Sequence, residues 1–225
     1  MQLVSVWLLV AAFIAPSDHA IEASHALEEA RIALAGGRDM TPARVEIDAV
    51  YRYVDDEEEI KDRTVIEPNQ RLYQEREIAG KVIRRSWTSK DAFIESHNGR
   101  MALDESMRAD LETYFCLRQL ELLILCPGAV VEGVDRADGH SKVITIQHRG
   151  QDLAEVEIAA DSHRLIAIRY TETLDPDSEA ERTEVRYSGY QDVAGGWTLP
   201  HRVQTLVDGQ ARSSYSVQSW RLEAR

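Results

Sequence analysis

The C-terminal half of the sequence is a series of short segments in which hydrophobic and polar residues alternate. From Ala129 onward, the segments VVEGVDR, KVITIQH, LAEVEIAA, RLIAIRYTET and ERTEVRYSGYQDV follow one another with short turns between them. Alternation with a period of two is typical of a half-buried strand, because successive side chains of a strand point to opposite faces. Strands joined by short turns pair with their neighbours in antiparallel order. This half therefore predicts a long antiparallel meander rather than βαβ units.

The N-terminal half adds further strands and two helices. Strands are expected in VEIDAVYRYV (45–54), RLYQEREIAG (71–80), KVIRRSWTS (81–89) and DAFIESHNGR (91–100). Hydrophobic residues at helical spacing predict one helix from Ile21 to the Gly36-Gly37 stop. A second helix is expected from Asp104 to about Leu125, before Pro127-Gly128. The predicted fold class is α+β, with one long curved antiparallel sheet wrapped around two or more helices that cover its apolar face.

The stretch from Tyr187 to Val217 determines the expected register of the last three strands. Two three-residue loops, 194–196 and 207–209, place Tyr187 opposite Val203 and Val203 opposite Ser213. This register puts the large hydrophobic side chains on one face, whereas a one-residue slip in the second loop would mix them with charged residues. Pro200 then lies on the polar face. It marks a bulge or the end of a sheet edge, because proline cannot donate a ladder hydrogen bond.

An apolar run, Leu3–Ala15, precedes the first helix. Spanning a bilayer takes roughly 20 apolar residues, so the run favours a secretory signal peptide over a transmembrane helix. We expect cleavage after Ala20 or Ala26, which assigns residues 1–26 to the leader and 27–225 to a single domain. No Lys or Arg precedes the run, and a buried first helix is the alternative interpretation.

Cys116 and Cys126 are the two cysteines of the chain. In one continuous helix their separation along the axis would be ~15 Å, whereas a disulfide needs Cα atoms within ~7 Å. The sequence therefore predicts two buried thiols, unless the helix ends early enough to bring them together.

The charge balance and the sequence motifs exclude several classes of function. A formal net charge of -13 argues against nucleic acid as a partner, because phosphate contacts need a basic surface. The seven histidines show neither HxH nor HExxH spacing, so no metal site is predicted. Nucleophile motifs, nucleotide-binding glycine loops and a distinctive carboxylate pair are missing, which predicts no catalytic residues and no cofactor. These features favour a binding protein over an enzyme.

Several segments resemble one known superfamily. The segment YSGYQDVAGGWTLPHRVQTLVDGQARSSYSVQSWRL resembles the C-terminal meander of the LolA/LolB superfamily of outer-membrane lipoprotein-sorting domains. In that superfamily a Y-x-x-Y/F-x-x-V-x-G-x-x-L-P hairpin commonly closes the sheet. VEIAADSHRLIAIRY is similar to its strand–turn–strand unit, and VEIDAVYRYV and EPNQRLYQEREIAGKVIRRSW look like its opening elements. The resemblance covers nearly the whole chain after the leader and rests on structural turn signals.

The resemblance implies an incomplete β-barrel whose apolar concave side, covered by helices, holds acyl chains. It implies a non-enzymatic periplasmic protein that binds a lipid or the acyl chains of a lipoprotein, and we expect a monomer. Methionine, aromatic and leucine side chains suit such a lining, although they also fill ordinary cores. The candidate lining residues are Trp87, Phe93, Met107, Leu111 and Phe115. The alternative is an envelope sensory or scaffolding domain that binds a protein partner through the sheet edge near Pro200.

Overall fold

The computed structural model describes residues 17–56, 58–137, 139–172 and 180–224. The apolar run Leu3–Ala15 lies outside these ranges. Within them, no helix has the length and hydrophobicity needed to cross a membrane.

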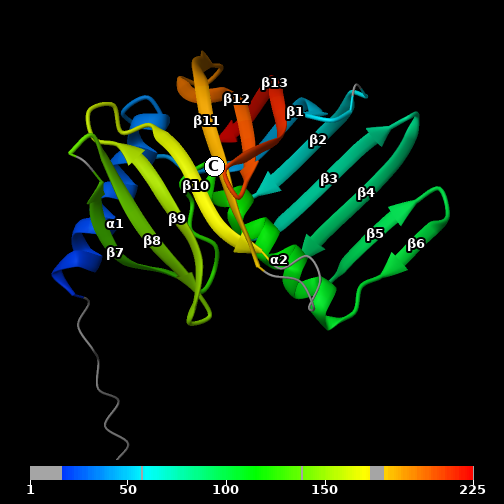
Figure 1. Ribbon diagram of the computed structural model, residues 1–225, viewed down its shortest axis with the longest axis horizontal. Coiled ribbons are helices and arrows are strands. Elements are labelled where there is room, and N and C mark those ends of the chain that lie inside the picture. Colours follow the sequence, from blue (N-terminus) through cyan, green and yellow to red (C-terminus); the bar gives the residue numbers. More distant parts are fainter. Residues whose placement is uncertain (1–16, 57, 138, 173–179, 225) are drawn as a thin grey trace, which may run out of the picture.

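The described residues form two helices and one sheet of 13 strands (Figure 1). The helices are α1 (Asp18–Leu34) and α2 (Glu105–Leu120). The strands are β1 (Pro42–Tyr53), β2 (Ile60–Glu67), β3 (Arg71–Ile78), β4 (Lys81–Thr88), β5 (Ala92–Ser96), β6 (Gly99–Ala102), β7 (Ala129–Ala137), β8 (Ser141–His148), β9 (Gln151–Ala159), β10 (Leu165–Glu172), β11 (Glu181–Val193), β12 (Trp197–Val207) and β13 (Gln210–Ala224).

All neighbouring strands pair antiparallel, in the order β6-β5-β4-β3-β2-β1-β13-β12-β11-β10-β9-β8-β7. Two meanders, one before α2 and one after it, are joined side by side through the long pairing of β1 with β13. β6 and β7 are the two ends of the sheet, so it stays open as an incomplete barrel. The predicted α+β class and the curved antiparallel sheet are confirmed.

The sheet bends around α2 (Figure 1). This helix contacts β4 on one side of the bend and β9 on the other. It begins at Asp104, whose Oδ1 accepts a hydrogen bond from the backbone N of Met107 at 2.9 Å, a capping interaction of the kind that starts helices. Phe115, which has no exposed surface, anchors the helix against Trp87, with 4.6 Å between the ring centroids.

Helix α1 packs on β7, with further contacts to β8 and β12. Its buried face includes the small residues Ala23, Ala26 and Ala30, which allow a close approach to the strands. The helix begins at Asp18, three residues before the predicted start at Ile21, and it ends before the predicted glycine stop. Gly36 has a φ of 65°, and a Cβ added there would lie 2.1 Å from the backbone oxygen of Gly196 in the β11–β12 turn.

The register of the last three strands is partly as predicted. The β11–β12 loop has three residues, and Tyr187 pairs with Val203 as expected. The second loop was predicted wrongly: Val207 pairs with Gln210 around a two-residue turn. A bulge after Thr205 then shifts the register, so that Val203 pairs with Tyr215 instead of Ser213. The bulge compensates the one-residue change in loop length, so the alternation of side chains stays in phase and the hydrophobic side chains remain on one face.

Pro200 does not lie at a sheet edge or in solvent. It is buried in β12, an interior strand, and its carbonyl oxygen accepts a hydrogen bond from Trp220 Nε1 at 3.1 Å. The pairing of β12 with β13 runs from Val207 to Arg202 and stops before Pro200. Pro200 still pairs with Tyr190 of β11, but on the β13 side it lies beyond the end of the ladder, so its missing N–H group removes no bond to β13. The expectation of a partner-binding edge near Pro200 is wrong.

The predicted end of the second helix at Leu125 is also wrong. The helix ends at Leu120, and Leu123 has a left-handed φ of 55° in the turn that follows. The chain folds back, which brings the Cα atoms of Cys116 and Cys126 to 5.2 Å, and the two residues form a disulfide. The expectation of two free thiols assumed a continuous helix and fails for that reason. Leu120, Leu122 and Leu123 are buried, which agrees with the all-round hydrophobicity of this segment.

Candidate functional site

The concave face of the sheet carries a buried polar network where it meets the C-terminal half of α2. The network begins at Asp62 on β2, which is 4% exposed. Its carboxylate accepts hydrogen bonds from Thr64 Oγ1, Gln74 Nε2 and Arg76 Nε, each at 2.7 Å. Asp62 and Thr64 alternate along β2, and Gln74 and Arg76 alternate along the adjacent β3, so all four side chains share the inner face.

A second ion pair lies at the end of α2. Arg118 Nη1 donates to Glu121 Oε1 at 2.5 Å and to the Tyr215 hydroxyl at 3.2 Å. Arg118 is 5% exposed and Glu121 is 6% exposed. Burial raises the pKa of the Glu121 carboxyl above its usual range, while Arg118 and the hydroxyls of Tyr187 and Tyr215 favour the ionised form. Arg118 Nε is buried without a hydrogen-bond partner in the described residues.

Aromatic rings connect the two ion pairs. The Arg76 guanidinium lies 4.9 Å from the ring centroid of Tyr51, which packs 4.5 Å from the ring of Tyr215. On the helix side, Gln74 Nε2 donates to the Tyr114 hydroxyl at 3.1 Å. Two buried ion pairs add little to stability, since desolvation offsets their attraction. A cluster of this kind in a concavity is a candidate functional site.

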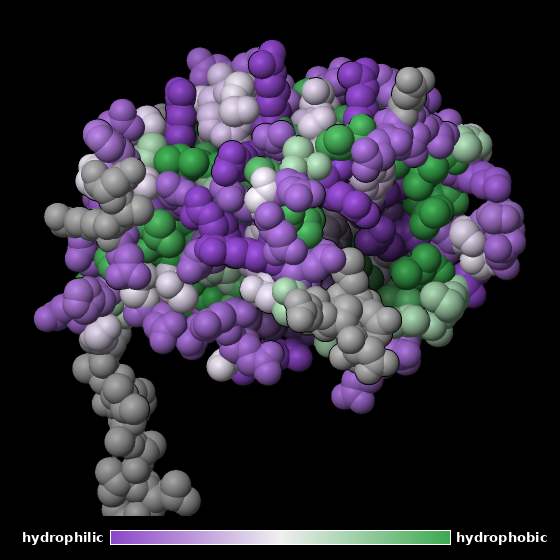
Figure 2. Space-filling view, in the orientation of Figure 1, coloured by the Kyte–Doolittle hydropathy of each residue, from purple (hydrophilic) through white to green (hydrophobic). Residues whose placement is uncertain are grey.

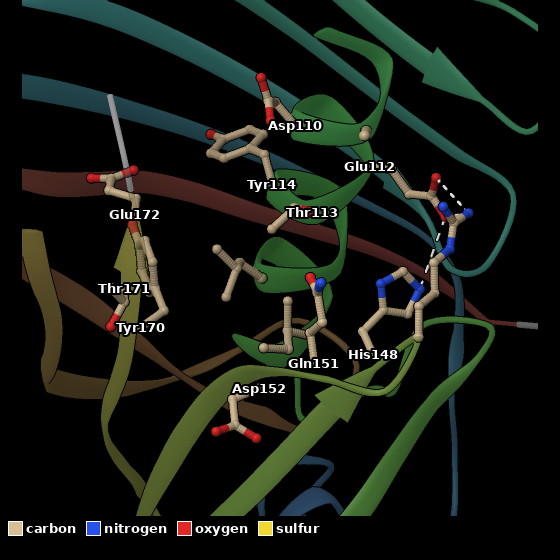
Figure 3. A pocket seen from close by; sticks show the side chains of 14 residues that line it. Asp110, Glu112, Thr113, Tyr114, His148, Gln151, Asp152, Tyr170, Thr171 and Glu172 are labelled. Carbon is tan, nitrogen blue, oxygen red and sulfur yellow. Dashed lines mark hydrogen bonds and ion pairs between the residues drawn. The ribbon is translucent and has the colours of Figure 1, made fainter. Parts of the chain in front are cut away.

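A cleft of about 610 Å³ opens beside this network, between α2 and strands β8–β10 (Figure 3). We call it the α2 cleft. It is lined by Ala109, Asp110, Glu112, Thr113, Tyr114, Leu117, His148, Arg149, Gln151, Asp152, Leu153, Tyr170, Thr171 and Glu172. Figure 3 shows Tyr114 and Tyr170 on one side and Glu112 with His148 on the other. Glu112 accepts a hydrogen bond from Arg149 Nη2 at 2.7 Å and lies 3.9 Å from His148 Nε2. The rim is therefore charged and mainly acidic.

A smaller chamber of about 90 Å³ adjoins the cleft and shares Tyr114, Leu117 and Tyr170 with it. We call it the tyrosine chamber. It is lined by Tyr51, Tyr114, Leu117, Arg118, Glu121, Ile168, Tyr170, Val185, Tyr187, Thr205 and Tyr215. Burial raises the pKa of the Tyr51 and Tyr187 hydroxyls, so they remain protonated at neutral pH. The cleft has the charged rim, and the lining of the chamber includes the buried ion pair.

The structure places the five candidate lining residues in different surroundings. Trp87, Leu111 and Phe115 are brought together in the packed core under α2. Phe93 follows Ala92, which pairs with Trp87 on the inner face, so Phe93 points to the outer face. There the Arg100 guanidinium lies 3.7 Å from the centroid of the Phe93 ring. Met107 is 44% exposed at the start of α2. None of the five lines either of the two cavities described above.

The exterior of the protein is mainly polar. Figure 2 shows a largely hydrophilic face on which hydrophobic residues form several separate patches, on the left and on the right of the view. Among the described residues, Cys116, Cys126 and His148 are the group close enough to hold a metal ion. The two sulfur atoms of that group are bonded to each other in the disulfide.

Solved structures from several bacteria have the same architecture. A LolA superfamily protein from Nitrosomonas europaea is similar over 89% of this chain and 93% of that chain, with 11% identity and a TM-score of 0.53. A domain from Vibrio parahaemolyticus assigned to outer membrane lipoprotein sorting is similar over 90% and 93%, with 7% identity and a TM-score of 0.53. The chain has a LolA-like fold.

A DUF1329 family protein from Desulfovibrio piger is also similar, over 92% of this chain and 94% of that chain, with 11% identity and a TM-score of 0.57. No protein-family model and no curated protein sequence matches the chain. Identities this low establish the LolA-like fold alone, and the function has to be argued from the site.

Proposed function

We propose that the protein is a non-enzymatic binding protein of the bacterial periplasm that holds an amphipathic ligand, an acyl-bearing lipid or lipoprotein, in the α2 cleft. The observation that carries this proposal is the cleft of about 610 Å³ that adjoins the tyrosine chamber. Its volume falls within the range of about 300–1,000 Å³ that is usual for small-molecule sites. The LolA-like fold supports the proposal, because it places such a space between a helix and a curved sheet.

The lining of the cleft suits a ligand with an apolar and a polar part. Leu117, Leu153 and the rings of Tyr114 and Tyr170 form the apolar contacts, while carboxylates dominate the rim. Phe115 and Trp87 pack against each other in the core, so the acyl chain would lie along α2 and not between these two residues. The proposed ligand site thus differs from the lining expected from the sequence.

Displacement of a fluorescent fatty-acid probe tests the proposal. Leu117→Gln should weaken probe binding about tenfold, because an apolar contact worth ~1.5 kcal/mol is lost on the inner side of the helix. Met107→Gln on the same helix is the matched control and should leave binding unchanged, since Met107 lies outside the cleft. Equal effects of the two substitutions, or a wild-type protein that does not bind the probe, would refute the proposed site.

Native mass spectrometry of protein extracted from the periplasm without detergent provides a second test. The proposal predicts a bound species with the mass of a lipid or lipoprotein. Capture of an unlipidated envelope protein, with no lipid in any preparation, would instead favour the sensory or scaffolding alternative.

A further inference from the structure

Two cysteines and a histidine meet where the chain folds back after α2. Cys116 lies in α2, Cys126 lies in the segment that follows, and His148 is the last residue of β8. The backbone N of Ala129 donates to the carbonyl oxygen of Cys126 at 3.0 Å, and Ala129 pairs with His148, so the start of β7 holds Cys126 beside the end of β8. The two sulfur atoms and one ring nitrogen of His148 all lie within 4.8 Å of one another. Because the three residues come from different elements, no short spacing motif marks them in the sequence.

The backbone geometry suits a shared metal ion as well as a disulfide. Zinc binds thiolates at ~2.3 Å in tetrahedral geometry, which places two sulfur ligands about 3.8 Å apart. The Cα atoms of Cys116 and Cys126 are 5.2 Å apart. Rotation of the two side chains supplies the required separation of the sulfur atoms without moving the turn. Only the bond between the sulfur atoms keeps the group from binding an ion.

Burial and charge select the kind of ion. Cys116 is 1% exposed, Cys126 is 3% exposed and the side chain of His148 is 9% exposed. Two thiolates and a neutral imidazole balance the charge of a divalent cation, so the loaded site avoids the cost of a buried net charge. Sulfur and imidazole ligands favour a soft or borderline metal such as Zn²⁺ over Mg²⁺ or Ca²⁺.

The α2 cleft gives such an ion access to the site. His148 and Glu112 both line the cleft, and Glu112 Oε1 lies 3.9 Å from His148 Nε2 (Figure 3). A carboxylate beside a ligating histidine commonly orients the ring and raises its basicity. Three protein ligands leave the fourth position of a tetrahedral ion to a water molecule from the cleft.

We propose that Cys116, Cys126 and His148 form a redox-dependent site for a divalent thiophilic metal ion, closed by the disulfide and opened by a dithiol reductant. The dithiol breaks the bond between Cys116 and Cys126, transfers its two protons and two electrons to them, and leaves as its own disulfide. Binding of the ion then releases the two protons, because the metal ligands are thiolates. In an oxidising compartment the disulfide is the resting state.

The metal ion takes over the structural role of the bridge. Either cross-link ties the C-terminal part of α2 to the segment before β7, and the ion adds a connection to β8. A ligand that binds only the folded state stabilises it. Zn²⁺ should therefore raise the Tm of the reduced protein toward that of the oxidised protein and leave the Tm of the oxidised protein unchanged.

Titration with Co²⁺, a spectroscopic substitute for Zn²⁺, tests the site directly. The full-length protein is reduced with dithiothreitol and freed of it by gel filtration under nitrogen. The reduced protein should bind an equimolar amount of Co²⁺, with thiolate-to-cobalt charge-transfer absorption and the visible bands of tetrahedral coordination. Zn²⁺ should displace the Co²⁺, and the oxidised protein should show neither absorption.

Two histidine variants show whether the ion lies where the structure places it. His148→Ala should weaken Co²⁺ binding by more than about tenfold, since even the loss of an outer partner of a ligand costs that much. His97→Ala is the matched control and should leave binding unchanged, because His97 is exposed in the turn between β5 and β6.

Three results would overturn the proposal: no tetrahedral spectrum in reduced wild type, equal spectra in the oxidised and reduced proteins, or equal binding by the two histidine variants. If reduction unfolds the protein, Zn²⁺ should restore the circular-dichroism spectrum of the folded state, and failure to do so also counts against the site. None of these results bears on the proposed binding of an amphipathic ligand, which the fatty-acid probe tests with oxidised protein.

Discussion

Removal of the Cys116–Cys126 disulfide tests how the C-terminal end of α2 is held. The two residues are separated by 10 positions in the chain, and the bridge fixes the turn that carries Leu122 and Leu123 into the core. In the chain-entropy description, closing a loop of this length stabilises the folded state by about 2.7 kcal/mol at 25 °C. For a domain of this size, that free energy corresponds to a Tm lower by about 5–11 °C.

The double variant Cys116→Ala/Cys126→Ala should show this loss in thermal unfolding followed by circular dichroism. Wild-type protein treated with a thiol reductant should melt near the variant, because both lack the cross-link. The same reductant should leave the Tm of the variant unchanged, which controls for effects of the reductant elsewhere.

Thiol labelling gives the result that would refute the reasoning. Denatured wild-type protein should take up no iodoacetamide unless it is first reduced. If it is labelled without reduction, or if the variant melts with the oxidised wild type, the bridge does not hold the turn, and a helix that continues to Leu125 again becomes the better description.

Three further predictions concern α1, Glu121 and the leader. Gly36→Ala should cost about 2–5 kcal/mol in urea unfolding, because its Cβ would meet a backbone oxygen at 2.1 Å and its φ is left-handed. Gly37→Ala, with a φ of 82° but open space around it, should cost only about 1–2 kcal/mol, and equal losses would contradict the close contact. Because burial raises the folded-state pKa of Glu121, its contribution to stability is fully present below the unfolded pKa of ~4.3 and is lost as pH rises through the folded pKa. Glu121→Gln should therefore gain stability relative to wild type as pH rises through that window, and a constant difference in unfolding free energy would contradict this. If the protein is exported as proposed, N-terminal sequencing should find cleavage after Ala20 and not after Ala26, since cleavage after Ala26 would remove the buried Ala23 and Ala26 from α1, whereas cleavage after Ala20 keeps them.

Most strands could be predicted because their signal is local, but β2 (Ile60–Glu67) was not predicted. In β3 and β8 the alternation of polar and apolar residues is carried by the segment itself and matches one wet and one buried face. Within each meander, the short turns predicted that strands consecutive in the sequence are neighbours in the sheet. The pairing of β1 with β13, which joins the two meanders, brings residues such as Ile47 and Trp220 together from opposite ends of the chain, and no local pattern specifies it.

The end of α2 could not be predicted for a related reason. The residues LELLILC are good helix formers, so their intrinsic preference favours continuation past Leu120. Tertiary contacts override that preference: the turn at Leu123 lets both Leu122 and Leu123 reach the core, and the disulfide closes the same turn. A missed helix end thus concealed both the bridge and the position of Glu121.

The buried polar network around Asp62 was missed although the sequence contains a signal for it. In IKDRTVIE, Asp62 and Thr64 occupy the alternate positions that belong to the inner face together with Ile60 and Ile66. Polar residues at such positions are expensive to bury and indicate a partner across the core. The partner residues Gln74 and Arg76 follow the same alternation on the next strand, so the polar layer could have been inferred from two neighbouring strands.

That layer also divides the interior into two parts with different roles. The N-terminal half of α2 places Leu111 and Phe115 on a fully apolar region that includes Trp87, and this region accounts for the packing of the helix. The C-terminal half places Arg118 beside Tyr215 and in an ion pair with Glu121. Because replacing a buried ion pair by apolar residues of similar size is often neutral for stability, the polar layer is better described as a candidate functional site than as a requirement of packing.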